Sequence, residues 1–142
     1  MATVELSFTA LPAHVRTARL VATAVARRSG VDESLLDEVR LAVGEACSRA
    51  VEGHQLYCPA EPVRLALTDL AGRFEVEVTD NLSGGPAGIA GPQGIADGHD
   101  EAVLPAGLGI AVIESLADDV QISATPDGTS IRMSWPSAGA SR

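Results

Sequence analysis

Three groups of residues in this sequence could do chemistry together, although they lie far apart in the chain. Glu45 lies in the middle of a helix-like segment, where its carboxylate could take a proton from a hydroxyl or a water molecule. Asp80 ends a strand-like segment and can accept hydrogen bonds from a base or a sugar. Gly107-Leu108-Gly109 opens another helix-like segment, whose first N–H groups favour a phosphate. A nucleotide site would use residues of these types.

The segment from Val31 to His54 is the helix that must position Glu45. Asp32 is a plausible N-cap, and Gly53 supplies a stop signal. Glu45 falls at the edge of an apolar stripe. The stripe has helical spacing and consists of Leu35, Val39, Ala42, Val43, Ala46, Cys47, Ala50 and Val51.

The other elements follow from their periodicity. Alternating residues predict strands, and three-to-four spacing predicts helices. We expect a strand at 3–8, a helix from Pro12 to before Gly30, a hairpin over 63–78, a helix over 108–116, and strands at 120–124 and 131–135. This order predicts an α+β fold, a two-layer sandwich in which helices cover one face of a mostly antiparallel sheet.

The stretch from Asp80 to Ala106 is rich in glycine and proline and shows no period. Such a long irregular segment inside a compact domain is either a functional lid or a disordered segment. The segment is therefore a first sign of a site. The tail, residues 136–142, is small and polar, and we expect it to be flexible.

Composition excludes several classes of function. The chain of 142 residues has the size of one domain, and its net charge of -9 opposes direct binding to nucleic acid. It contains no lysine for a Schiff base or a Walker-type phosphate contact. Neither a membrane-length apolar run nor a signal-peptide pattern is present, so we expect a cytoplasmic protein that does not insert into membranes.

In the order of its motifs the sequence resembles the GHKL ATPase superfamily, and within it the RsbW-like anti-sigma-factor serine kinases of bacteria. RLAVGEACSRAVEGH is similar to the N-box helix, and VTDNLSGG to the first glycine box. GLGIAVIESLADDVQI is similar to the second glycine box, and DGTSIRMSW to the closing hairpin. The resemblance extends from Val4 to Trp135 and depends on the order and spacing of these motifs together.

The resemblance implies a Bergerat-type fold with a mostly antiparallel mixed sheet of about five strands under three helices. ATP would lie between the helix layer and a lid at residues 81–106. The general base would be Glu45 and the adenine contact Asp80, with Thr129 beside the adenine. Backbone would approach the nucleotide at residues of the two glycine boxes, namely Gly84, Gly107, Leu108 and Gly109.

Resemblance to this family also implies partner switching. We expect an anti-sigma factor that captures a sigma factor and is relieved by an anti-anti-sigma antagonist of the STAS type. The alternatives are an active serine/threonine kinase that phosphorylates this antagonist, and an interaction module without nucleotide. Whether the chain forms a homodimer stays open.

The match to the family breaks at two positions. The N-box normally has a magnesium-binding Asn four residues after its Glu, and this chain has Arg49 there. A guanidinium has no lone pair for a metal, although it can pair with Glu45 or contact a phosphate. The first glycine box normally has Gly where this chain has Leu82. Both departures weaken the case for Mg²⁺ and for kinase activity more than the case for the fold.

Ordinary explanations exist for the same residues. Glu45 could be a solvated helix residue, and Asp80 a turn former. Cys47, His54 and Cys58 could suggest zinc, but a structural zinc normally takes four ligands, so we expect no metal there.

Overall fold

The computed structural model describes residues 2–82 and 106–138. Residues 83–105 of the expected lid, Gly84 among them, and residues 139–142 of the expected tail lie outside the described residues. The elements are β1 (Ala2–Phe8), α1 (Pro12–Arg28), the 3-10 helix η1 (Glu33–Leu35), α2 (Leu36–Tyr57), β2 (Val63–Leu70), β3 (Arg73–Thr79), α5 (Ala106–Leu116), β4 (Asp119–Thr125) and β5 (Gly128–Pro136).

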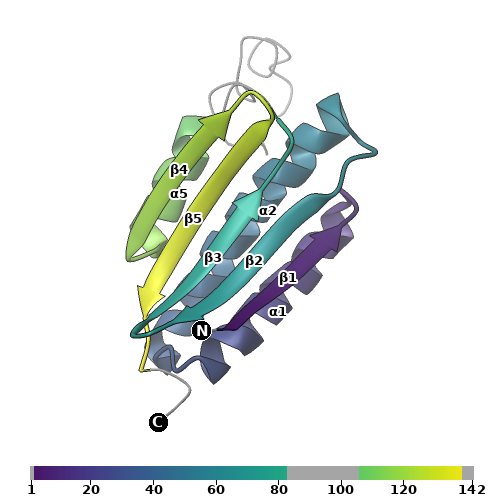
Figure 1. The fold of residues 1–142 in the computed structure, drawn as a ribbon. Helices are drawn as coiled ribbons and strands as arrows, with labels where there is room; N and C mark the ends of the chain where they lie inside the picture. The colour runs from purple at the N-terminus through teal and green to yellow at the C-terminus, as the bar shows by residue number, and fades with distance from the viewer. Residues whose placement is uncertain (1, 83–105, 139–142) are drawn as a thin grey trace.

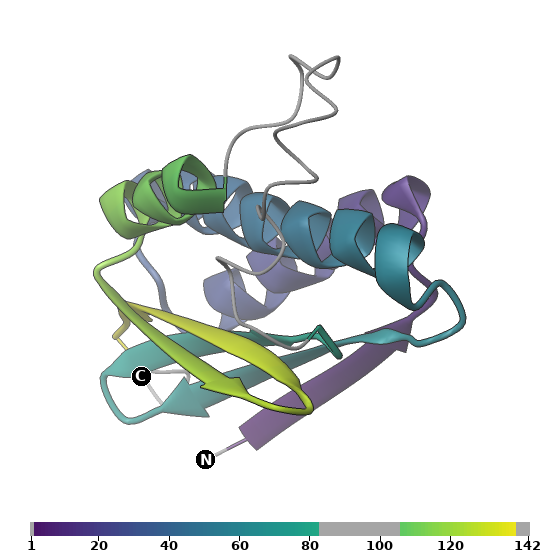
Figure 2. The same ribbon diagram turned by 90° about the horizontal axis from the view of Figure 1, so that it is seen from above.

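The five strands form one open sheet in the order β1-β2-β3-β5-β4, and every pairing among them is antiparallel. The helices cover one face of this sheet, as Figure 2 shows. In Figure 1, α2 runs behind the sheet between α1 and α5. These layers confirm the predicted α+β sandwich.

The core lies between the sheet and the helices because each strand alternates in polarity. In β3 the side chains of Phe74, Val76 and Val78 are buried, whereas those between them are only partly covered. Trp135 on β5 packs against Phe74 and donates an indole N–H to the Leu116 carbonyl at 3.1 Å. This bond ties the end of α5 to the sheet.

The face of the sheet that the helices leave open is polar. Arg132 on β5 forms ion pairs with Glu75 at 3.0 Å and Glu77 at 3.6 Å, both on β3. Such partly exposed cross-strand pairs add little stability but suit a solvent-facing surface.

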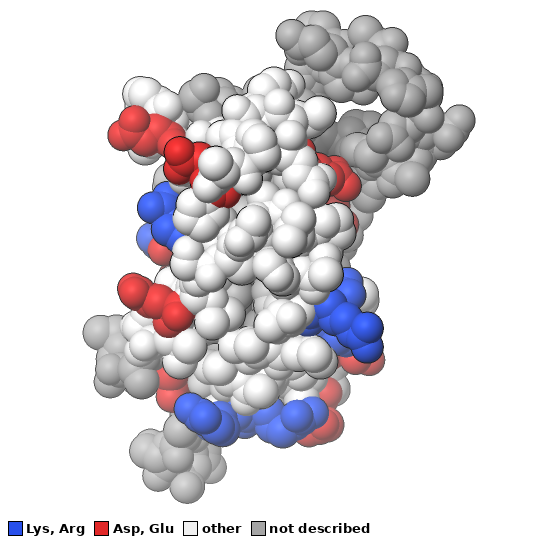
Figure 3. Space-filling view, turned by 90° about the vertical axis from the view of Figure 1, so that its right-hand side faces the viewer, with Lys and Arg blue, Asp and Glu red and all other residues white. Residues whose placement is uncertain are grey.

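Figure 3 shows the side of the molecule that carries α1 and β1, where charged residues lie around a broad uncharged area.

The central helix differs from its prediction at both ends. It begins at Leu36 rather than at Val31, because Asp32 caps η1 by accepting the Ser34 N–H at 2.9 Å. The prediction that Gly53 stops the helix was wrong, because α2 continues to Tyr57.

Among the described residues, no helix combines the length and the apolar character needed to cross a membrane.

Candidate functional site

Asp80 is buried at the end of β3 and holds two separate segments together. Its Oδ1 accepts the Leu82 N–H at 2.9 Å and the Thr129 N–H at 3.0 Å. Its own N–H donates to the Thr129 carbonyl at 2.9 Å. The Thr129 hydroxyl donates to the Leu82 carbonyl at 3.3 Å. Asp80 and Thr129, which the sequence placed in one site, are therefore in direct contact.

Gly128 permits this contact. A Cβ atom at position 128 would lie 2.0 Å from the Asp80 carbonyl oxygen and 3.2 Å from the Asn81 Cα. These neighbours are backbone atoms, which cannot move away as a flexible side chain can. The first residue of β5 must therefore be glycine for steric reasons.

Glu45 and Arg49 lie on α2 directly beneath the first turn of α5. A Cβ atom at Gly109 would be 3.0 Å from Glu45 Oε2 and 3.4 Å from Arg49 Cδ. Gly109 thus lets the start of α5 approach both side chains closely. Gly107 and Leu108 belong to the same helical turn. The structure therefore brings the N-box residues and the second glycine box together.

Arg49 joins the two halves of the site electrostatically. It is only 7% exposed, and its charge acts on Asp80, Glu45 and Glu52. Burial lowers the pKa of the Arg49 guanidinium, and these three carboxylates oppose that change. Burial also raises the pKa of Glu45, which the nearby Arg49 charge opposes. Glu45 is half-buried at the edge of the apolar stripe of α2.

We expect the substitution Glu45→Gln to stabilise the protein at neutral pH. A carboxyl whose pKa is higher in the folded state destabilises that state when it is ionised. The gain should be full above the pKa of Glu45 in the folded protein and should disappear as pH falls through 4.5, the ordinary pKa of a glutamate. Urea unfolding of both proteins between neutral and acidic pH measures this. Equal stability at neutral pH would contradict the proposed desolvation.

Leu82, which stands where the first glycine box has glycine, is buried against α2. A Cβ atom at Gly53 would lie only 2.3 Å from Leu82 Cδ1. Because Gly53 has no side chain, α2 leaves room for the Leu82 side chain, which a glycine at position 82 would lack. This complementarity explains why Gly53 lies inside the helix, where glycine costs about 1 kcal/mol relative to alanine.

His54 is a positioning residue that the sequence analysis missed. Its buried ring accepts the Asn81 N–H through Nε2 at 3.0 Å, so Nδ1 carries the proton and donates to the Glu61 carbonyl at 2.8 Å. The His54 ring thus fixes the residue after Asp80 to the end of α2. Both ring nitrogens have protein partners, which leaves neither of them for a metal ion shared with Cys58.

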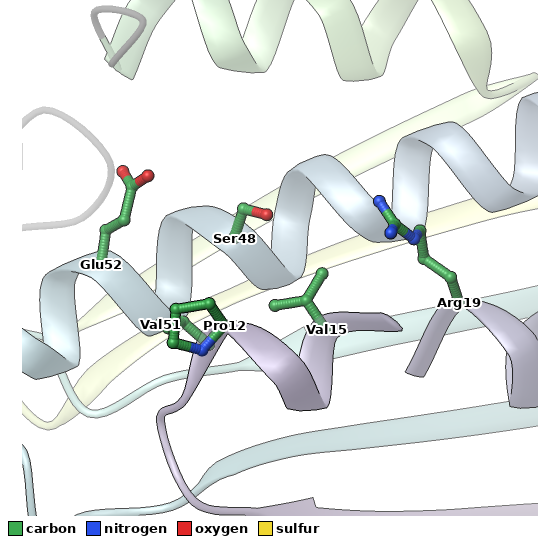
Figure 4. A pocket seen from close by; sticks show the side chains of 6 residues that line it. All are labelled: Pro12, Val15, Arg19, Ser48, Val51 and Glu52. Carbon is green, nitrogen blue, oxygen red and sulfur yellow. The ribbon is translucent and has the colours of Figure 1, made fainter. Parts of the chain in front are cut away.

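A separate pocket of about 220 Å³ lies between α1 and α2. Pro12, Val15 and Arg19 line it from α1, and Ser48, Val51 and Glu52 line it from α2, as Figure 4 shows. Neither Glu45 nor Asp80 lines this pocket. Glu52 connects the two regions, because its charge also acts on Arg49.

The fold and this site define a class of protein. The profile of the histidine kinase-like ATPase domain matches residues 8–135, so the chain belongs to this GHKL family. Within the family it is RsbW-like: it is 28% identical over 136 residues to the serine-protein kinase RsbW of Bacillus pumilus. That match covers 92% of this chain and 83% of the Bacillus protein.

A solved structure has the same fold. It contains the RsbU and RsbW domains of a Mycobacterium tuberculosis protein, with a TM-score of 0.66 and 18% sequence identity. The match covers 94% of this chain and 32% of that one, so our chain spans about a third of the mycobacterial chain.

Proposed function

We propose that the protein is a cytoplasmic anti-sigma factor that an anti-anti-sigma antagonist of the STAS type controls. The similarity to RsbW along nearly the whole chain carries this proposal. The strongly acidic net charge of -9 supports it as well, because acidic surfaces attract basic faces of a partner and speed association.

A nucleotide site is part of the proposal. Asp80 and Thr129 would contact the base, and the first turn of α5 would receive the phosphates between Gly107 and Gly109. Support comes from the close approach of Gly109 to Glu45 and Arg49 and from the buried hydrogen bonds of Asp80. Arg49 would contact a phosphate through its guanidinium.

Co-purification tests the anti-sigma role. The tagged protein would be mixed in turn with each purified sigma factor of its source organism, and an equimolar complex with at least one of them is expected on a sizing column. A purified STAS-type antagonist should release that sigma factor. Failure to retain any sigma factor would count against the proposal.

The second candidate function is ATP-dependent phosphorylation of the antagonist on serine or threonine. Glu45 favours it, because burial raises the pKa of this carboxyl toward the value a general base needs. Label from ATP should then appear on the antagonist and be lost in Glu45→Ala. The exposed Glu33→Ala serves as a control that keeps activity.

The third candidate is an interaction module without nucleotide. The observation that favours it is Leu82, whose buried side chain packs onto Gly53 beside Asp80. Calorimetry with ATP separates this candidate from the first two. An interaction module without nucleotide should give no heat of ATP binding but should still retain the sigma factor.

A further inference from the structure

The residues of the site do not fit Mg²⁺, which the GHKL family implies. Magnesium takes oxygen ligands in octahedral geometry. Arg49 offers no lone pair at the position one turn after Glu45. Asp80 already uses Oδ1 for two backbone N–H groups. Within residues 2–82 and 106–138, no three His, Cys, Asp or Glu side chains are grouped to hold a metal ion.

Arg49 places a positive charge where the family places the metal. Its side chain is buried on α2, and the methylene groups pack beneath Gly109 at the start of α5. Its charge interacts with the carboxylates of Asp80, Glu45 and Glu52. An arginine stays protonated in proteins, so this positive charge is permanent. Its planar group can also bind two phosphate oxygens at once.

We propose that Arg49 replaces the divalent cation, so that the site binds a nucleoside triphosphate without magnesium. The inference rests on the nucleotide site of the proposed function and concerns binding alone. The guanidinium would neutralise part of the phosphate charge beneath the first turn of α5. A divalent cation would not increase the affinity for the nucleotide, because the positively charged Arg49 already occupies the position of the cation.

Calorimetric titration with ATP tests this inference, once with magnesium and once with EDTA. For the natural protein we expect the same Kd within about twofold in both buffers. Arg49→Asn should bind about tenfold more weakly in EDTA, the equivalent of one charged hydrogen bond, and recover with magnesium. Arg49→Lys keeps the charge and should stay independent of magnesium.

Arg40→Asn is the matched control, because Arg40 lies on the same helix but is exposed and paired with Asp37. Its ATP binding should equal that of the natural protein. Magnesium-dependent binding by the natural protein, or no binding in either buffer, would overturn the inference, and neither result requires a variant to fold. Retention of a sigma factor is measured without nucleotide, so failure of this inference is distinct from failure of the anti-sigma role.

Discussion

Gly128→Ala should destabilise the protein by about 3 kcal/mol, the upper range for overpacking a tightly packed site. The added Cβ would lie 2.0 Å from the Asp80 carbonyl oxygen, and backbone atoms must move to relieve this clash. The shift would separate Thr129 from Asp80 and so disturb the proposed base contact. Calorimetric melting should show a Tm lower by about 6 to 12 °C.

Gly72→Ala is the matched control for this substitution. Gly72 has φ +79° in the turn between β2 and β3, and a Cβ there would meet nothing within 4 Å. Its cost should be about 1 to 2 kcal/mol from backbone strain alone, with ATP affinity unchanged. Equal losses in the two variants would mean that contact with Asp80 is not the reason for Gly128.

His54→Ala should cost about 3 to 4 kcal/mol, because it leaves a cavity in place of a buried ring and removes two partly buried hydrogen bonds. The Asn81 N–H and the Glu61 carbonyl both lose their hydrogen bonds to the ring. Urea unfolding measures the loss. Amide exchange at Asn81 and Leu82 should accelerate, since the ring holds this segment against α2.

Two further variants test whether the hydrogen bonds of the His54 ring matter, one at position 54 and one at a second histidine as a control. His54→Gln retains an acceptor near the place of Nε2 and should restore part of the stability. His14→Ala removes only a more exposed ring, bonded to the Thr9 carbonyl at 2.9 Å, and should cost about 1 kcal/mol. Full stability of His54→Ala would contradict the positioning role.

The fold could be predicted because local patterns determine most of it. Alternation in β3 and helical spacing along α2 reflect burial against one layer, and the structure confirms both. Gly53 misled the prediction because the reason for it is not local. Its partner Leu82 comes after two intervening strands, and a sequence pattern does not show which distant side chain fills the space above a glycine.

The site was predicted in part. The structure brings Glu45, Arg49 and Gly109 together, and it places Asp80 against Thr129. Their roles toward a nucleotide stay predictions. His54 was missed because a single histidine near a helix end carries no signal for its function. Its importance depends on the Asn81 and Glu61 backbone, which only the folded chain brings to both ring nitrogens.

Transcription in a purified system tests the anti-sigma role most directly. RNA polymerase carrying each sigma factor of the source organism would transcribe a matched promoter while this protein is added in increasing amounts. We predict that transcription from at least one promoter falls to background near equimolar protein and returns when the STAS-type antagonist is added. Undiminished transcription with every sigma factor, at a large excess of folded protein, would contradict the proposed function.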